Sequence, residues 1–469
     1  MRKLPVLIVI LLIISCNQTL QEKNQARIKP YSGNQFYWQY KGKPILLIGA
    51  SKDDNLFQIP DLKEHLDEIS KAGTNYVRNT MSERLVNGYE VRAFMKTEGK
   101  YDLNQWNNEY WQRFSNLLNW AYERDIIVQI EIWATHDFFT REKWDASPWN
   151  PDQNVNFSYE DTKLSRKVPE YAKDFHPFFN TIPKVLNDSI VLGYQQNFVD
   201  KILSYTLSMP NVLYCITNEI QHAQSQYWSW YWAEYIKNEA EKLNVDVFVT
   251  EMFWAPDLKD DQHKHSYLHP EYFSYFESSQ NSAKSGQQNW DNLQFIRNEL
   301  LAEPKPINSV KIYGKTDSIV KWPGKDEEAI DRFWRNILGG CASSRFHRDE
   351  KGVFGLGWCE YSINSLKAMG LFLEDIIPWE AAPGTELLIE RTENEAYLMA
   401  DTGNVYGIYL PGKASVKLNL PGQNSQYEMK WINVKKGECD SVYTIDGNGM
   451  IEISNPDSLT KWAITLSRK

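Results

Sequence analysis

Short apolar segments alternate with amphipathic segments along most of the chain. Eight apolar segments have the length and the β-branched or aromatic content of buried strands, and they span residues 45–50, 75–80, 126–133, 212–217, 247–252, 274–279, 307–314 and 342–348. Between most of them apolar residues recur at helical spacing, over residues 60–72, 107–124, 193–208, 225–243, 289–301 and 325–339. Strands that alternate with helices in this way predict an α/β protein, a parallel (β/α)8 or TIM barrel, rather than a doubly wound sheet.

The pattern changes at both ends of this predicted barrel, which we place at residues 31–380. At its start, FYWQY, the turn KGK and PILLIGAS predict a β-hairpin. From residue 385 to residue 469, short alternating strands separated by turns such as Asp446-Gly447 predict an all-β sandwich. An insert at 138–190, rich in Trp, Phe and Pro, follows the third strand and is expected on the active-site face.

The first sixteen residues have the pattern of a bacterial lipoprotein signal peptide. Arg2 and Lys3 precede an apolar run over 4–14, and Ile13-Ile14-Ser15-Cys16 reads as a lipobox. The apolar run is too short to span a bilayer core of about 30 Å. We therefore expect cleavage before Cys16, lipidation of that cysteine, and a polar tether over 17–30. This predicts a lipid anchor in the envelope of a Gram-negative bacterium, facing the periplasm or the cell surface.

Composition narrows the function classes. A formal net charge of −10 gives the chain no basic footprint for nucleic acid. Aromatic residues make up 14% of the chain, and flat apolar rings suit sugar faces as well as a protein core. Four of the five cysteines follow Cys16 without any C-x-x-C spacing, so neither a disulfide framework nor a zinc site is expected. His263, His265 and His269 match no strong metal-ligand spacing either.

The segment NVLYCITNEI, residues 211–220, carries the clearest chemical signal. An apolar run over 212–216 ends in Asn218-Glu219. An apolar setting raises the pKa of a carboxyl group toward neutral pH, so we expect Glu219 to serve as a general acid. Most glycoside hydrolysis uses two carboxylates, which raises the question of where the second one lies.

In a (β/α)8 barrel the working residues lie at the C-terminal ends of the strands. There the indoles of Trp133 and Trp254 are expected to stack on sugar rings or to pack at the rim. The other candidates are polar and are expected to bind hydroxyl or anionic groups of a substrate: Arg78, His136, Asn218, Gln280, Lys311, Arg345 and His347. Arg78 has an equal alternative role as the partner of a neighbouring acid.

Several of these segments together resemble a known family. They are KGKPILLIGAS, NVLYCITNE, SSQNS, PINSVKIYG, RFWRNILGGCASSRFHR, DIIPWE and, in the tail, YLMADTGNVYGIYLP and MKWINV. The layout is similar to retaining barrel glycosidases of clan A, and more narrowly to apiosidase-like bacterial barrels. The latter carry a small C-terminal β-domain often labelled a collagen-binding domain of a collagenase. The resemblance covers nearly all the chain after residue 16. It implies glycosidic hydrolysis with Glu219 as the acid/base and a Glu nucleophile near the end of strand seven.

The sequence departs from that family pattern at strand seven. PINSVKIYG has no carboxylate, and Lys311 stands about where the nucleophile is expected. In one hypothesis the second carboxylate is Glu251, which ends strand five, with Glu131 on strand three as the backup. Glu251 has an alternative role as a structural partner of a nearby cation. Whether the outcome is retaining or inverting stays open.

Two further hypotheses concern Lys311. With Arg78, Arg345, His347 and Arg348 it is expected to make the barrel mouth basic, which suits an anionic sugar. Alternatively, loss of the nucleophile leaves a glycan-binding lipoprotein without catalysis. A polysaccharide lyase that uses Lys311, Tyr313 or His347 as its base is a further alternative. The favoured function is hydrolysis of a complex polysaccharide or oligosaccharide, a reaction that requires no cofactor.

Overall fold

The structure is a computed structural model of the 469-residue chain. It describes residues 25–82, 85, 87–168, 176–221, 225–314, 324–348, 355–421, 425–447, 449–457 and 460–469. The predicted signal peptide, its lipidation site Cys16 and most of the predicted tether lie outside the described residues. Among the described helices, none has the length and apolar character that a membrane span requires.

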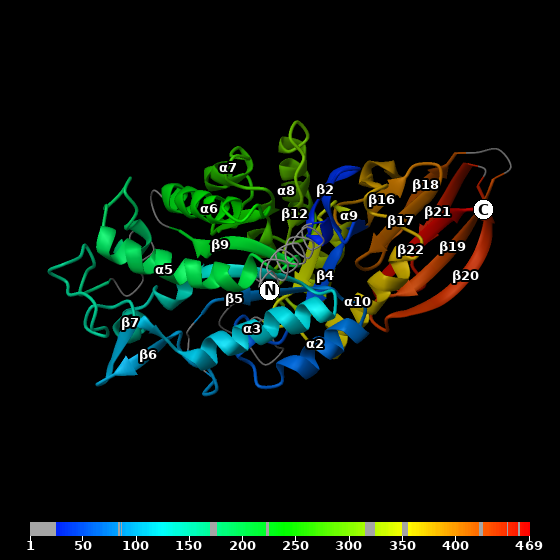
Figure 1. Ribbon diagram of the computed structural model, residues 1–469. Coiled ribbons are helices and arrows are strands. Elements are labelled where there is room, and N and C mark those ends of the chain that lie inside the picture. The colour runs from blue at the N-terminus through cyan, green and yellow to red at the C-terminus, as the bar shows by residue number, and fades with distance from the viewer. Residues whose placement is uncertain are drawn as a thin grey trace, which may run out of the picture.

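Eight parallel strands occupy the centre of the molecule (Figure 1). They are β4 (Leu47–Ala50), β5 (Tyr76–Thr80), β8 (Ile127–Ala134), β9 (Val212–Ile220), β10 (Val249–Phe253), β11 (Phe276–Glu277), β12 (Ile307–Asn308) and β13 (Ser343–Phe346). Strands β5, β8, β9 and β10 form one sheet, while β11 pairs with β12 and β13 pairs with β4.

Further backbone hydrogen bonds join these three groups of strands. The amide of Asn75 donates to the carbonyl of Ile48 at 3.0 Å, next to β4 and β5. The amide of Ser274 donates to Val249 at 2.8 Å, and the amide of Ala342 donates to Ile307 at 2.7 Å. The eight strands therefore follow one another in the cyclic order of a (β/α)8 barrel.

Amphipathic helices cover the outside of the strands. They are α2 (Leu62–Lys71), α3 (Asn108–Glu123), α5 (Ser189–Thr206), α6 (Ser225–Glu241), α7 (Asp261–Tyr267), α8 (Gly286–Glu299), α9 (Asp326–Leu338) and α10 (Glu360–Leu373). Helix α3 shows why these segments are helical. Tyr110, Phe114, Leu117 and Ala121 recur on its buried face, and the side chain of Asn107 caps its N-terminus. Helix α10 was not among the predicted helices.

The long connections lie at one end of the barrel. A hairpin of β6 (Phe94–Thr97) and β7 (Lys100–Trp106), absent from the predicted elements, follows β5. The described part of the insert at 138–190 contains only a short helix, α4 (Arg141–Ala146), and a 3-10 turn, η3 (Pro177–Asn180). Figure 1 shows β6 and β7 at the same end of the molecule as the insert.

A hairpin closes the opposite end of the strands. Strands β1 (Lys29–Tyr31), β2 (Asn34–Tyr40) and β3 (Lys43–Ile45) form a small antiparallel sheet, as the sequence predicts. From β2, the Trp38 indole donates to Asn308 Oδ1 at 2.8 Å, and the Asn308 amide donates to the Tyr76 hydroxyl at 3.1 Å. Tyr76 donates in turn to Gln129 at 2.6 Å. A polar layer thus fills the N-terminal end of the barrel.

The C-terminal strands form two antiparallel sheets. One sheet has the order β14-β16-β17-β22-β19-β20 and the other β15-β18-β21. Their bounds are β14 (Ala382–Pro383), β15 (Leu388–Ile389), β16 (Tyr397–Asp401), β17 (Val405–Leu410), β18 (Ser415–Leu420), β19 (Gln426–Asn433), β20 (Glu438–Asp446), β21 (Gly449–Ser454) and β22 (Trp462–Arg468). Leu398, Val416, Ile453 and Ile464 belong to one apolar cluster shared by the two sheets.

The six-stranded sheet packs its other face on the barrel. Tyr409 of β17 stacks on Trp334 of α9, with ring centroids 5.1 Å apart. The Tyr409 hydroxyl and the Lys461 ammonium both donate to Asp331 Oδ1 at 2.5 Å, and all three side chains are buried. A buried ion pair therefore joins α9 to the C-terminal sheets.

Replacing Asp331 with Ala leaves the buried Lys461 ammonium without its carboxylate partner. We expect a loss of about 3 kcal/mol in the free energy of unfolding, because an uncompensated buried charge is costly. Urea denaturation followed by tryptophan fluorescence measures it. The exposed pair Lys417–Glu390 provides the control, and Glu390→Ala should change stability by less than about 1 kcal/mol. Equal effects of the two substitutions would contradict the expectation.

Candidate active site

The end of strand β9 departs from regular strand geometry. Its pairing with β10 shifts register on both sides of Met252, which lies opposite Asn218. Pairing with β8 stays regular through Asn218. Glu219 then adopts a left-handed backbone with φ of 64°, which is uncommon for a residue with a side chain. The bulge turns the side chains of consecutive residues Asn218 and Glu219 toward the barrel mouth.

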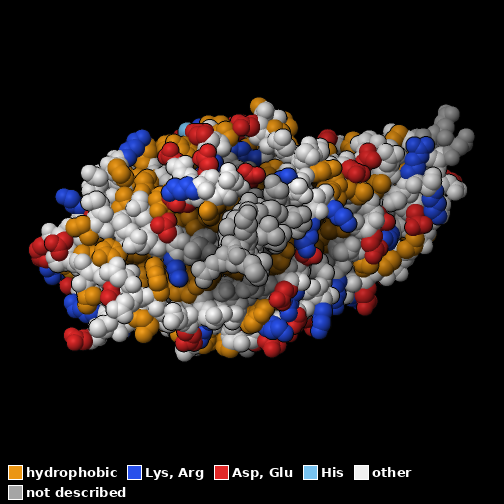
Figure 2. Space-filling view, viewed as in Figure 1, with side chains coloured by type: hydrophobic (Ala, Val, Ile, Leu, Met, Phe, Trp, Pro, Cys, Tyr) orange, Lys and Arg blue, Asp and Glu red, His pale blue; other side chains and the backbone are white. Residues whose placement is uncertain are grey.

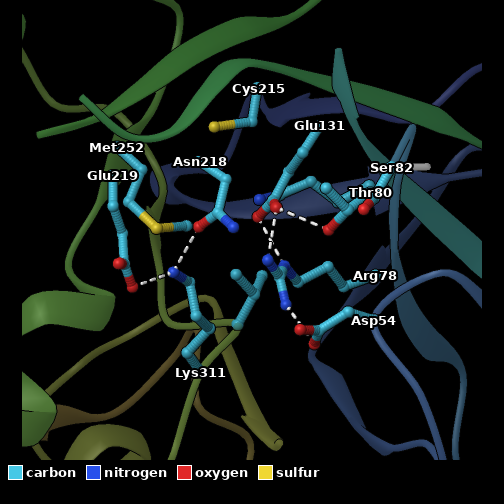
Figure 3. Close-up of polar contacts among 12 residues, drawn as sticks. Asp54, Arg78, Thr80, Ser82, Glu131, Cys215, Asn218, Glu219, Met252 and Lys311 are labelled. Atoms are coloured by element: carbon cyan, nitrogen blue, oxygen red, sulfur yellow. Dashed lines mark hydrogen bonds and ion pairs between the residues drawn. The ribbon is translucent and has the colours of Figure 1, made fainter. Parts of the chain in front are cut away.

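Lys311 joins these two side chains (Figure 3). Lys311 follows strand β12, and its ammonium donates to Glu219 Oε1 and to Asn218 Oδ1, both at 2.5 Å. The hydroxyl of Tyr313 also donates to Glu219 Oε1, at 3.2 Å. The Lys311 side chain is only 1% exposed, whereas that of Glu219 is 25% exposed. The carboxylate is thus the part of this cluster that solvent reaches.

The prediction that the pKa of Glu219 is raised toward neutral pH is wrong. Burial by itself raises the pKa of this carboxyl group, but the ammonium of Lys311 and a contact with Gln280 outweigh it and lower the pKa to about 2. A carboxyl group with that pKa holds no proton at neutral pH. In this arrangement Glu219 is suited to the role of a charged nucleophile or base and not to that of a general acid.

Arg78 belongs to a separate ionic cluster beside Lys311. Its guanidinium binds both oxygens of Glu131 at 2.5 Å and donates to Asp54 at 2.7 Å. His347 lies 3.3 Å from both Arg78 and Asp54, and Arg348 pairs with Asp54 at 2.9 Å. Burial lowers the pKa of His347 well below its ordinary value, so the imidazole is neutral. Glu131 therefore acts as a partner of Arg78 and not as a second catalytic carboxylate.

Most of the expected basic mouth is buried. Arg78, Arg345 and the neutral His347 are fully buried and Lys311 is 1% exposed, whereas the Arg348 side chain, paired with Asp54, is 33% exposed. Arg345 donates to Ser51 and to the carbonyl of Val310 inside the barrel. On the face in Figure 2, lysine and arginine side chains are interspersed with acids and form no extended basic patch.

Glu251 does not join Glu219. Side chains alternate between the two faces of a strand, and Met252 points into the barrel beside Glu219 and Asn218 (Figure 3). Glu251 consequently points outward, toward helix α6, where its Oε2 lies 2.5 Å from the Ser229 hydroxyl. It is 1% exposed, and burial raises its pKa to about 8. In this position Glu251 does not face Glu219 as the predicted second catalytic carboxylate.

The two predicted tryptophans lie in different surroundings. Trp133 is 2% exposed and packs against Trp149, Phe178, Phe198, Trp228 and Trp232. Trp133 is therefore a buried core residue and not an exposed stacking platform. Trp254 is 39% exposed, and its amide donates to the carbonyl of Ile220, next to Glu219, at 3.1 Å. An exposed tryptophan thus follows β10, at the strand end next to that of Glu219.

A pocket of about 320 Å³ opens at the end of β8, against residues of the insert, and its lining residues do not include Asn218 or Glu219. Trp133, Trp149 and Phe138 provide apolar walls, and Arg92, Asp137, Glu142 and Lys143 are also among its lining residues. The hydroxyl of Thr135, in the turn η2 (Thr135–Asp137), donates to the carbonyl of Asn218 at 2.5 Å. His136 of the same turn is exposed. The volume falls at the lower end of the range of ligand pockets, about 300–1,000 Å³.

Some site residues were missed or misassigned from the sequence. Asp54, which lies within 3.3 Å of Arg78, His347 and Arg348, was not among the predicted site residues. The sequence of residues 51–54, Ser-Lys-Asp-Asp, does not indicate which of its two carboxylates points into the barrel. Glu277, 1% exposed inside the barrel, was also missed, and burial raises its pKa to about 7. Among the described residues, no group of three or more His, Cys, Asp or Glu side chains is arranged to hold a metal ion.

Comparison with known proteins relates the fold to solved enzymes. No protein-family model and no curated protein matches the chain. A structure described as a glycoside hydrolase matches with a TM-score of 0.62 at 10% identity, covering 95% of this chain and 98% of its own. A glycoside hydrolase family 5 structure from Bacteroides vulgatus also gives 0.62, at 11% identity, covering 95% and 94%. At such low identity the similarity establishes a shared fold alone.

The Lys311 ammonium is expected to hold Glu219 in its charged form. Lys311→Met removes that ammonium while burial remains, so the pKa of Glu219 should rise from about 2 to above 4.5. Carbon-13 NMR of protein labelled at the glutamate carboxyl carbon, with the signal assigned by its loss in Glu219→Gln, follows the titration. Lys242→Met breaks a comparable ion pair with Glu239 on α6 and should leave the signal unchanged. A Glu219 pKa that stays near 2 in Lys311→Met contradicts the expectation.

Glu251 is expected to make the protein less stable as pH rises. Its pKa is raised from 4.5 to about 8 in the folded state, so folding retains a proton that the unfolded chain releases. Between about pH 5 and pH 8 the free energy of unfolding should fall by up to about 1.4 kcal/mol per pH unit relative to Glu251→Gln, which needs no proton. Urea titrations at several pH values measure the difference. Parallel pH curves for the two proteins would exclude this protonation.

Proposed function

We propose that the protein hydrolyses glycosidic bonds in a complex glycan and that Glu219 is its reactive carboxylate. The main support for this proposal is the exposed fraction of each acidic side chain on the barrel strands. Glu131 is fully buried and Glu251 and Glu277 are each 1% exposed, whereas the Glu219 side chain is 25% exposed at the mouth. Glu219 is therefore the strand acid, within the described barrel, that a substrate can reach.

Three other features support a glycan as the substrate. The barrel shares its fold with glycoside hydrolases over 95% of the chain. Active sites of such barrels lie at the C-terminal ends of the strands, where Asn218–Glu219 lies. Exposed Trp254, at the strand end next to that of Glu219, offers an apolar face for a sugar ring.

The charge state of Glu219 shapes its proposed role. A carboxylate held by Lys311 and Tyr313 is ready to attack an anomeric carbon or to activate water. The burial of Arg78, Arg345 and His347 gives no support to a preference for anionic sugars. We therefore favour a role for Glu219 as nucleophile or base in the hydrolysis of a neutral glycan.

The sequence pattern also supports a proposal about the chain's setting. We propose that Cys16 carries a lipid that anchors the protein in the bacterial cell envelope. We further propose that residues 385–469 form a domain separate from the barrel at 31–380. The apolar cluster shared by the two C-terminal sheets supports the second of these proposals.

A panel of plant and bacterial oligosaccharides tests the proposed activity. The wild-type protein should release reducing sugar from at least one substrate, and Glu219→Gln should lower kcat at least a hundredfold, because the amide cannot act as nucleophile or base. Glu239→Gln is the matched control. Its side chain is also 25% exposed and paired to a lysine at 2.5 Å, but it lies on α6.

The outcomes separate the alternative functions. Unchanged hydrolysis by Glu219→Gln removes Glu219 from the mechanism. Glycan binding without turnover on the whole panel favours a binding protein over an enzyme. Products with a new double bond, detected by ultraviolet absorbance, favour a lyase in which Tyr313 and Lys311, both in contact with Glu219 Oε1, handle the proton.

A further inference from the structure

We infer that Glu251 is a positioning residue that holds the Asn218–Glu219 bulge in its working geometry. The inference rests on the proposed role of Glu219 in glycan hydrolysis. It gives Glu251 a task that differs from the catalytic one first expected of it. Where the pairing of β9 and β10 becomes irregular, their backbone amides need acceptors outside the regular ladder.

The bulge interrupts the regular ladder between β9 and β10. Thr250 lies opposite Cys215, Met252 lies opposite Asn218, and Phe253 lies opposite Ile220. Strand β9 thus contains extra residues on both sides of Asn218 relative to β10. A bulge leaves backbone groups without their ladder partners, and buried amides need another acceptor.

The Glu251 carboxyl group supplies that acceptor. Its Oε1 accepts the amide of Thr217 at 3.0 Å and the amide of Met252 at 2.8 Å. Thr217 belongs to β9 and Met252 to β10, so one oxygen bridges the two strands at the irregular step. The second oxygen, Oε2, contacts the Ser229 hydroxyl of α6 at 2.5 Å. Glu251 therefore links β9, β10 and helix α6 through hydrogen bonds.

The Ser229 contact also favours a neutral Glu251. The Ser229 hydroxyl has one proton and two oxygen neighbours, Glu251 Oε2 at 2.5 Å and the carbonyl of Ser225 at 3.0 Å. If Ser229 donates to Ser225, a protonated Oε2 donates to Ser229, and both contacts are satisfied. A glutamine at this position has the same shape, with an acceptor for the two amides and a donor for Ser229.

The bulge is held from its other side as well. The Thr135 hydroxyl, after strand β8, lies 2.5 Å from the carbonyl of Asn218 and 3.3 Å from that of Glu219. Glu251 fixes the amide of Thr217, immediately before these residues. Between the two anchors the chain passes through the left-handed backbone of Glu219. Removing the Glu251 anchor should let the carboxylate of Glu219 leave its place at Lys311.

Three variants test this positioning role. Glu251→Gln keeps the acceptor for both amides, Glu251→Met keeps the volume but removes it, and Ser229→Ala removes only the contact to α6. We expect Glu251→Gln and Ser229→Ala to keep kcat within about threefold of wild type. Glu251→Met should lower kcat at least tenfold with little change in KM, because the bulge moves the reacting carboxylate and not the sugar-binding surface.

Hydrogen–deuterium exchange gives a readout that needs no substrate. Peptides covering 212–220 should exchange faster in Glu251→Met than in wild type or Glu251→Gln, while peptides covering 127–134 of β8 should not change. This readout stands even if the glycan panel yields no turnover, which would refute the proposed activity alone. If Glu251→Gln, unlike Glu251→Met, keeps both the kcat and the slow amide exchange of wild type, Glu251 positions the bulge and does not merely stabilise the fold.

Three results would overturn the inference. If Glu251→Gln loses activity as fully as Glu251→Met, the charge of Glu251 matters and positioning through a neutral group is wrong. If Glu251→Met lowers the melting temperature but retains kcat and the protection of 212–220, Glu251 contributes only to stability. A loss of activity in Ser229→Ala equal to that in Glu251→Met would place the anchor at α6 instead of at the two amides.

Discussion

The pairing of charged groups inside the barrel is the constraint on which the site depends. A buried ion is tolerated only with a partner that compensates its lost hydration. Arg78 meets this demand with Glu131 and Asp54, and Lys311 meets it with Glu219. Each pair joins different strands, so the charges that fill the barrel also fix the positions of its strand ends. The accessible carboxylate of the site is one member of this paired set.

This constraint determines the chemistry available at the mouth. A carboxyl group alone in an apolar setting keeps its proton, as Glu251 does on the outer face of β10, where burial raises its pKa to about 8. Glu219 has the Lys311 ammonium and Gln280 beside it, and its pKa falls to about 2. The same side-chain type thus takes opposite charge states on neighbouring strands, and the Lys311 ammonium is the largest cause of the lowered pKa of Glu219.

The sequence was sufficient for the order of the strands and for placing Asn218–Glu219 at the end of a barrel strand. Alternating periodicity predicted the eight barrel strands, and the polar residues that end β9 pointed to its mouth. It was insufficient wherever the direction of one side chain mattered. Glu251 was expected in the cleft because it ends a strand, yet the register shift opposite Asn218 and strand alternation turn it outward. Trp133 looked like a platform, but aromatic residues distant in the chain cover its ring.

The bulge at Glu219 shows why such details escape pattern analysis. Val212 to Ile216 has the composition of any buried strand, and nothing in it signals that three residues later the backbone turns left-handed. A left-handed non-glycine residue costs of order 1–3 kcal/mol and persists only where its surroundings enforce it. Here they include Thr135 on one side and Glu251 on the other. The geometry of the carboxylate is therefore a property of three strands together, which the segment NVLYCITNEI does not contain by itself.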